Sequence, residues 1–168
     1  EPPGLWPPAS RTLINDLDND GRLDTVLLGP NEATLQFGGK REPIRIDLGG
    51  LDATSVALID YDNDGWLDLW FAGGFETHAE RGAVRLFRNP GFRASPLPEW
   101  RDVSEPTKLA NLKLPPIRDA IAADLDGDAD SDLLLTDTNG RLHFLRNVGA
   151  HANVQLKLRL LTVKTNPT

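Results

Sequence analysis

The chain has 168 residues, of which 39% are hydrophobic and 26% charged, a composition typical of a folded protein and unlike that of a disordered tail. Its formal net charge is −7 and its basic residues are scattered, so the electrostatic footprint of a nucleic-acid binder is absent and we expect no nucleic-acid partner. No run approaches the ~20 apolar residues of a membrane-spanning helix, and the absence of cysteine excludes disulfides, zinc–thiolate sites and cysteine nucleophiles.

The chain opens with residues 1–10, where four prolines predict an extended linker or tail. Residues 11–50 form the first predicted unit, with a short apolar run, an acidic loop at residues 16–24 and a second apolar run at residues 25–28. Apolar residues in consecutive positions, with glycine nearby, indicate short strands that are buried on both faces. Residues 45–48 are the candidate fourth strand of this unit.

Residues 51–115 repeat this order, with an acidic loop at residues 60–68 and an apolar run at residues 69–71. The second unit is longer than the first because it contains a widened hairpin and a proline-rich connection, which we interpret as an insertion. Residues 100–104 are its candidate fourth strand.

Residues 116–168 form the third unit, with an acidic loop at residues 124–132 and a candidate fourth strand at residues 155–160. Successive acidic loops begin 44 and then 64 residues apart, which fits the ~40–50 residues of a four-stranded propeller blade plus one insertion. We find no strongly amphipathic helix. The sequence therefore predicts an all-β fold of about three four-stranded β-propeller blades.

The three acidic loops share one spacing, DxDxD followed by a small residue, two further residues and a fourth Asp. Twelve of the 25 acidic residues thereby lie in 27 positions. These residues are Asp16, Asp18, Asp20, Asp24, Asp60, Asp62, Asp64, Asp68, Asp124, Asp126, Asp128 and Asp132. One such loop could be a plain β-turn with a solvated acidic surface, since Asp and Gly are turn formers. Three copies, each between two predicted strands, indicate that every loop binds a ligand of the same kind.

Four carboxylates within nine residues repel one another unless a cation neutralises them, and oxygen ligands at this density suit Ca²⁺. Loop positions 1, 3 and 5 would direct side chains inward, position 6 would form the turn, and position 9 would complete the ligand set. Position 7 would add only a main-chain carbonyl, from Arg22, Trp66 and Asp130. We therefore predict three structural Ca²⁺ sites; Mg²⁺ fits less well because it requires a stricter octahedral geometry.

The loops resemble the first half of an EF-hand loop, but an EF-hand requires Glu at position 12. That position is occupied by Leu27, Phe71 and Leu135, so an EF-hand is excluded. The third loop has Ala129 at position 6, where a left-handed backbone is expected, and we predict that its site is the weakest or most irregular of the three.

The loop Asp60-Tyr-Asp-Asn-Asp-Gly-Trp-Leu-Asp68 resembles the calcium loop of the FG-GAP/VCBS repeat family. The sequence from Leu86 to Phe92 and the residues after Trp100 are similar to a phrase of the subgroup that ends in an ASPIC/UnbV domain, to which cartilage acidic protein is similar. Residues 153–166 resemble the opening of that domain. The resemblance implies a calcium-stabilised β-propeller, usually secreted or periplasmic, that often serves as a binding or scaffolding module. It does not imply a reaction, and we expect that the protein is not an enzyme.

Three functions remain open from the sequence. The first is a noncatalytic module that presents loops to a protein or glycan partner, with Trp66 as a candidate contact residue. The second is a hydrolase or lyase site on the propeller face, which would need a base such as His78 or His143 near a nucleophile or carboxylate; no histidine has a recognisable partner motif in the sequence. The third is a structural spacer in a larger assembly.

Location and assembly can also be predicted. Local loops of this kind resemble extracellular calcium modules with dissociation constants of ~10⁻⁴–10⁻³ M, so we expect a secreted, periplasmic or cell-surface protein. Three blades cannot close a ring without exposing strand edges and apolar faces. We therefore expect either additional blades from a longer parent chain or self-association to complete the propeller.

Overall fold

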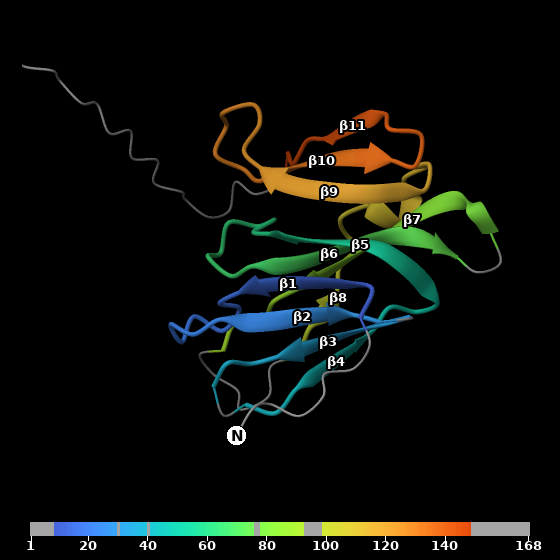
Figure 1. Ribbon diagram of the computed structural model, residues 1–168. Helices are drawn as coiled ribbons and strands as arrows, with labels where there is room; N and C mark the ends of the chain where they lie inside the picture. Colours follow the sequence, from blue (N-terminus) through green and yellow to red (C-terminus); the bar gives the residue numbers. More distant parts are fainter. Residues whose placement is uncertain (1–8, 30, 40, 76–77, 93–98, 149–168) are drawn as a thin grey trace, which may run out of the picture.

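The computed structural model describes residues 9–29, 31–39, 41–75, 78–92 and 99–148 (Figure 1). Most of the predicted proline-rich tail, the candidate strand at residues 155–160 and the ASPIC/UnbV-like segment lie outside these residues. Within the described part of the chain, the secondary structure consists of strands and one short 3₁₀ helix, η1 (Leu109–Asn111). The expectation of an all-β fold is confirmed.

The strands form three antiparallel sheets, each with its strands in chain order. Sheet 1 contains β1 (Arg11–Asn15), β2 (Asp24–Leu28), β3 (Glu32–Gln36) and β4 (Ile44–Asp47). Sheet 2 contains β5 (Leu51–Ile59), β6 (Asp68–Phe75), β7 (His78–Arg88) and β8 (Arg101–Asp102). Sheet 3 contains β9 (Ile117–Ala123), β10 (Asp132–Asp137) and β11 (Leu142–Leu145) among the described residues. No described helix is long and apolar enough to cross a membrane.

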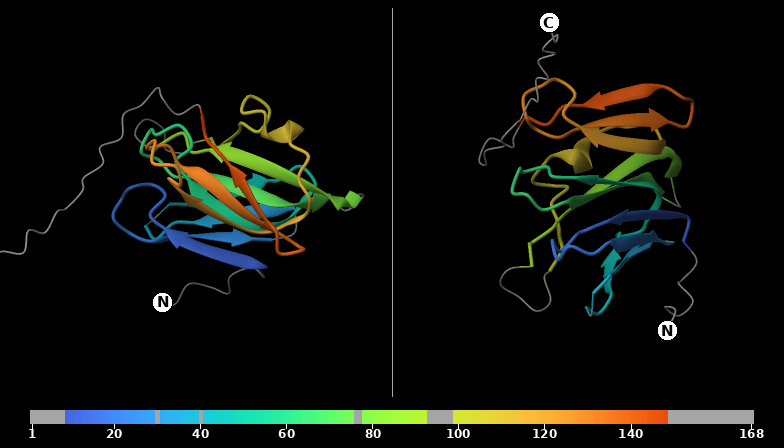
Figure 2. Two further views of the ribbon diagram at one scale, coloured as in Figure 1. Left: turned by 90° about the horizontal axis from the view of Figure 1, so that it is seen from above. Right: turned by 60° about the vertical axis from the view of Figure 1, so that its left-hand side comes forward.

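The three sheets lie one above another, with sheet 2 in the middle (Figures 1 and 2). The first strands of successive sheets contact one another, β5 lying against both β1 and β9. Thr54 connects all three strands: its carbonyl accepts a hydrogen bond from Arg11 Nε at 2.8 Å, and its hydroxyl donates to the carbonyl of Ile117 at 2.8 Å. Polar contacts therefore link the first strands of the three sheets in addition to their apolar packing.

One apolar core lies between sheets 1 and 2, and a second lies between sheets 2 and 3. Phe71 of β6 packs with residues of sheet 1, such as Leu28 and Leu35, whereas the neighbouring Trp70 packs with Leu135 of sheet 3. Successive residues of a strand point to opposite faces. Both side chains are fully buried because the two faces of sheet 2 are each covered by a neighbouring sheet. This explains why the runs that follow the acidic loops are apolar at consecutive positions, as expected for strands covered on both sides.

A tight contact within sheet 2 yields a testable prediction. The pairing of β5 with β6 is irregular between Ala53 and Ser55, and a Cβ added at Gly73 would lie 2.0 Å from the carbonyl oxygen of Asp52. Gly73→Ala is therefore expected to lower the free energy of unfolding by about 3 kcal/mol, since backbone atoms must move to accept the methyl group.

Urea unfolding would measure this loss, with Gly50→Ala as the matched control. Gly50 has a positive φ of 79° and open space around its Cβ position, so its substitution adds backbone strain of about 1 kcal/mol without a clash. Equal losses in the two variants would contradict the close approach at Gly73.

Candidate metal centres

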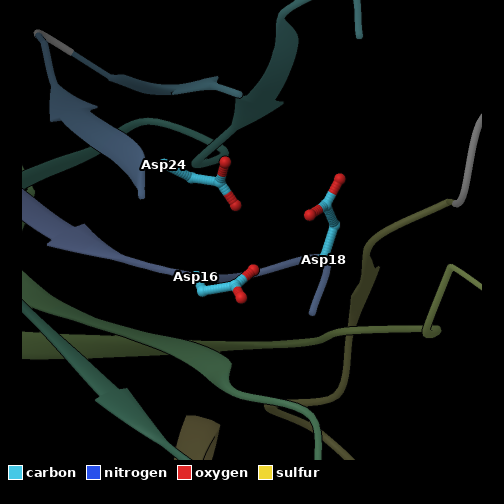
Figure 3. Close-up of side chains that lie close together, drawn as sticks. All are labelled: Asp16, Asp18 and Asp24. Carbon is cyan, nitrogen blue, oxygen red and sulfur yellow. The ribbon is translucent and has the colours of Figure 1, made fainter. Parts of the chain in front are cut away.

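The acidic loops connect the first and second strands of the three sheets: loop 1 (residues 16–24), loop 2 (residues 60–68) and loop 3 (residues 124–132). In each loop, one carboxylate oxygen from each of positions 1, 3 and 9 lies within 4.8 Å of the others. The three groups are Asp16, Asp18 and Asp24; Asp60, Asp62 and Asp68; and Asp124, Asp126 and Asp132. Figure 3 shows the three carboxylates of loop 1 facing a common space. Each group could hold a metal ion.

The position-1 carboxylate closes the turn of its own loop. In loop 2, the two oxygens of Asp60 accept hydrogen bonds from the backbone amides of Asp64 and Gly65, both at 3.0 Å. Asp16 accepts the equivalent amides in loop 1 at 3.1 and 2.8 Å. Gly65 supports this turn with a φ of 85°, a conformation that glycine adopts without strain. The spacing of Asp and Gly thus determines the local conformation that brings the carboxylates together.

The position-9 carboxylates are the most buried part of the site. Asp24, Asp68 and Asp132 are at most 1% exposed, and each accepts two backbone amides, one from its own loop and one from a residue one or two positions after the third strand. Burial raises the pKa of Asp68 to about 8, with a further contribution from the carboxylates of Asp62 and Asp64. Burial also raises the pKa of Asp24. Burial therefore disfavours the ionised forms of Asp24 and Asp68, and a bound cation would offset that cost.

Loop 3 departs from this arrangement as the sequence predicted. Ala129 has a φ of 82°, a left-handed conformation that is strained for a residue with a Cβ. Asp124 accepts a hydrogen bond from the amide of Gly127 at 2.7 Å and a longer one from Ala129 at 3.3 Å. Loop 3 is thus the most irregular of the three loops.

The position-5 residues Asp20, Asp64 and Asp128 lie outside the three metal-capable groups. One oxygen of each accepts the backbone amide of position 7, at 2.8 to 3.0 Å. The predicted ligand roles of these side chains and of the carbonyls of Arg22, Trp66 and Asp130 stay predictions.

Two position-7 side chains have contacts that the sequence did not indicate. The Asp130 carboxylate is 2% exposed and accepts a hydrogen bond from Asn63 Nδ2 in loop 2 at 2.8 Å. Trp66, considered above as a contact residue for a partner, is half-buried beside Phe92, with a ring separation of 6.1 Å. Asp130 therefore links two loops, and Trp66 contributes to packing within the protein.

Asparagine side chains that follow the third strands of sheets 2 and 3 form hydrogen bonds to the loop of the preceding sheet. The side-chain amide of Asn89, which is fully buried, donates to the carbonyls of Leu17 at 3.0 Å and Leu67 at 3.1 Å. Asn147 donates in the same way to the carbonyl of Tyr61 at 2.7 Å. Leu17 and Tyr61 occupy position 2 of loops 1 and 2, so each of these loops is tied to the following sheet. The repeated Arg-Asn pair in the sequence was the available signal for this role.

His143, one of the two bases that the enzymatic alternative named, lies beside a carboxylate that also shapes a hairpin turn. His143 Nε2 lies 3.0 Å from Asp137 Oδ2, and Asp137 also accepts the amides of Asn139 and Arg141, which close the hairpin between β10 and β11. The hydrogen bond from His143 lowers the pKa of Asp137. A pocket of about 410 Å³ lies between sheets 2 and 3, and no histidine lines it. The side chain of His78 and all of His151 lie outside the described residues.

Comparison with known proteins finds one family model that matches part of the chain. No curated protein matches the chain. The family model of the FG-GAP-like repeat matches residues 16–71, which extend from the first Asp of loop 1 through loop 2 and into β6. The matched segment therefore contains two of the three acidic loops and the sheet boundary between them. Residues 16–71 are therefore similar to an FG-GAP-like repeat, and the three antiparallel sheets are consistent with this similarity.

Proposed function

We propose that the chain is a calcium-stabilised β-propeller module with no catalytic activity, which serves as a rigid frame for binding a protein or glycan partner. The observation that carries this proposal is the recurrence of the same three-carboxylate group in all three loops. Its ligand atoms are oxygens alone, which suit Ca²⁺ better than the softer metals that prefer sulfur or imidazole. Because each ligand set is local to one loop, the role of the ion is structural.

The exposed face of sheet 3 supports the proposal that further blades complete the propeller. Ile121, Leu142 and Phe144 are 64%, 65% and 49% exposed on the side of sheet 3 that faces away from sheet 2. The corresponding residues of sheet 2 by strand register are Ala57, Val84 and Leu86, all buried at the contact with sheet 3. We propose that another blade covers this face in the same way, from a longer parent chain or from a second copy.

The proposed location follows from the proposed affinity. Calcium sites with dissociation constants of ~10⁻⁴–10⁻³ M are filled outside the cytoplasm and empty inside it. The module would accordingly act in a secreted, periplasmic or cell-surface protein. The relation to the ASPIC/UnbV subgroup is part of this proposal and rests on sequence resemblance; residues 86–92 and 100–104 lie within the described part of the chain, and residues 153–166 lie outside it.

Isothermal titration calorimetry of the chelator-treated protein would test calcium binding. We expect three Ca²⁺ ions per chain, one for each carboxylate group, and weaker binding of Mg²⁺. Asp60→Asn is expected to abolish one site, because it removes a ligand charge from loop 2. Asp52→Asn, an exposed position on β5 outside the loops, is the matched control and should retain all sites. Absence of binding at millimolar Ca²⁺ would overturn the proposal.

A further inference from the structure

We propose that Arg41, Arg88 and Arg146 are built-in counter-ions of the acidic loops, which stabilise each loop without metal and thereby lower its affinity for a divalent cation. This inference rests on the proposed function, because the competition requires that the loops bind a metal. It assigns to the arginines a role in setting the calcium affinity.

Two of the arginines bridge the same pair of carboxylates in their loops. Arg88 Nε lies 2.8 Å from Asp62 Oδ2, and Arg88 Nη2 lies 2.8 Å from Asp64 Oδ2. Arg146 makes the equivalent contacts in loop 3, to Asp126 Oδ2 at 2.5 Å and to Asp128 Oδ2 at 3.0 Å. A guanidinium thus joins positions 3 and 5 in both loops, in the geometry of a charge-assisted hydrogen-bonded pair.

Loop 1 receives its guanidinium from a different place in the sequence. Phe37 occupies the place that Arg88 and Arg146 have in the other sheets, because the next residue in each sheet donates its amide to the position-9 carboxylate. Arg41, four residues later, contacts Asp18 Oδ2 through its Nε atom. Its guanidinium also lies 4.7 Å from the ring centroid of Phe92.

The same carboxylate is therefore paired in all three loops, although the arginine comes from two different sequence positions. The paired residues Asp18, Asp62 and Asp126 all occupy position 3 and all belong to the metal-capable groups. An arginine from either of two sequence positions contacts the same carboxylate. We infer that the fold provides a positive charge at the position-3 carboxylate of each loop.

The charge of the arginine has opposite effects on the two states of a loop. Without metal, it offsets the repulsion among the carboxylates and stabilises the loop. With metal bound, it lies close to another cation and destabilises the complex. Both effects lower the affinity of the site for metal, while the metal-free protein gains stability.

The test compares Arg88→Gln with the unmodified protein, because glutamine keeps a long polar side chain and removes the charge. In the presence of chelator, the melting temperature of the variant is expected to fall by about 3 °C. In calcium calorimetry, one of the three sites is expected to bind about 10-fold more tightly. Arg146→Gln, on a more exposed side chain, should change both quantities in the same directions.

Arg85→Gln is the matched control, since Arg85 pairs with Asp102 at 3.6 Å and contacts neither carboxylate of loop 2 that Arg88 bridges. It should leave the calcium affinities unchanged. Weaker or unchanged calcium binding in both Arg88→Gln and Arg146→Gln, with normal binding by the unmodified protein, would overturn this inference alone. If neither the unmodified protein nor the variants bind calcium, the proposed function fails and the inference fails with it.

Discussion

Addition of about 10 mM Ca²⁺ to the chelator-treated protein is expected to raise its melting temperature by about 8–16 °C. At a dissociation constant of ~10⁻³ M, each filled site contributes about 1.4 kcal/mol, so three sites contribute about 4 kcal/mol. For a domain of this size, each kcal/mol corresponds to about 2–4 °C. The physical source of the gain is neutralisation of buried carboxylates such as Asp68, which is fully buried and has a raised pKa.

Differential scanning calorimetry or circular dichroism would measure this shift. Sodium chloride at equal ionic strength controls for simple screening of the surface charge, and Mg²⁺ at equal concentration tests the preference for calcium. Asp60→Asn should reduce the shift by about a third, because one of the three sites is lost. A shift of the same size in sodium chloride would show that screening, and not site binding, stabilises the protein.

Asn89→Ala is expected to lower the free energy of unfolding by about 3 kcal/mol. The fully buried side-chain amide of Asn89 donates hydrogen bonds to the backbone carbonyls of Leu17 and Leu67, and the substitution removes both bonds. It also removes the acceptor for the amide of Gly91. The backbone amide of residue 89 remains, so its hydrogen bond to Asp68 is retained and calcium binding should persist.

Urea unfolding of Asn89→Ala would be compared with that of Asn147→Ala. Asn147 is only half-buried and lies at the equivalent place in sheet 3, where its side chain donates to Tyr61. We expect a loss of about 1 kcal/mol there, because its partners can regain hydrogen bonds to water. An equal or smaller loss in Asn89→Ala would refute the bracing role of the buried amide.

The sequence by itself determined the features that depend on neighbouring residues. The Asp and Gly spacing of residues 60–68 sets the turn, because Asp60 bonds amides only four and five residues away. The same locality allowed the strand before and the strand after each loop to be predicted. The irregularity of loop 3 could also be predicted from the sequence, because Ala129 takes a left-handed conformation that its side chain disfavours.

Only the tertiary structure decided which side chains support the loops from a distance. Asn63 reaches Asp130, and Asn89 reaches Leu17, across 67 and 72 residues of chain. Arg41 reaches Asp18 although its place in the sequence differs from that of Arg88 in the repeat. These contacts follow from how the sheets stack and how the strand register places the chain after β3 and β7. Spacing along the chain specifies a loop by its local hydrogen bonds, but the contacts between loops require the packed sheets to bring distant residues together.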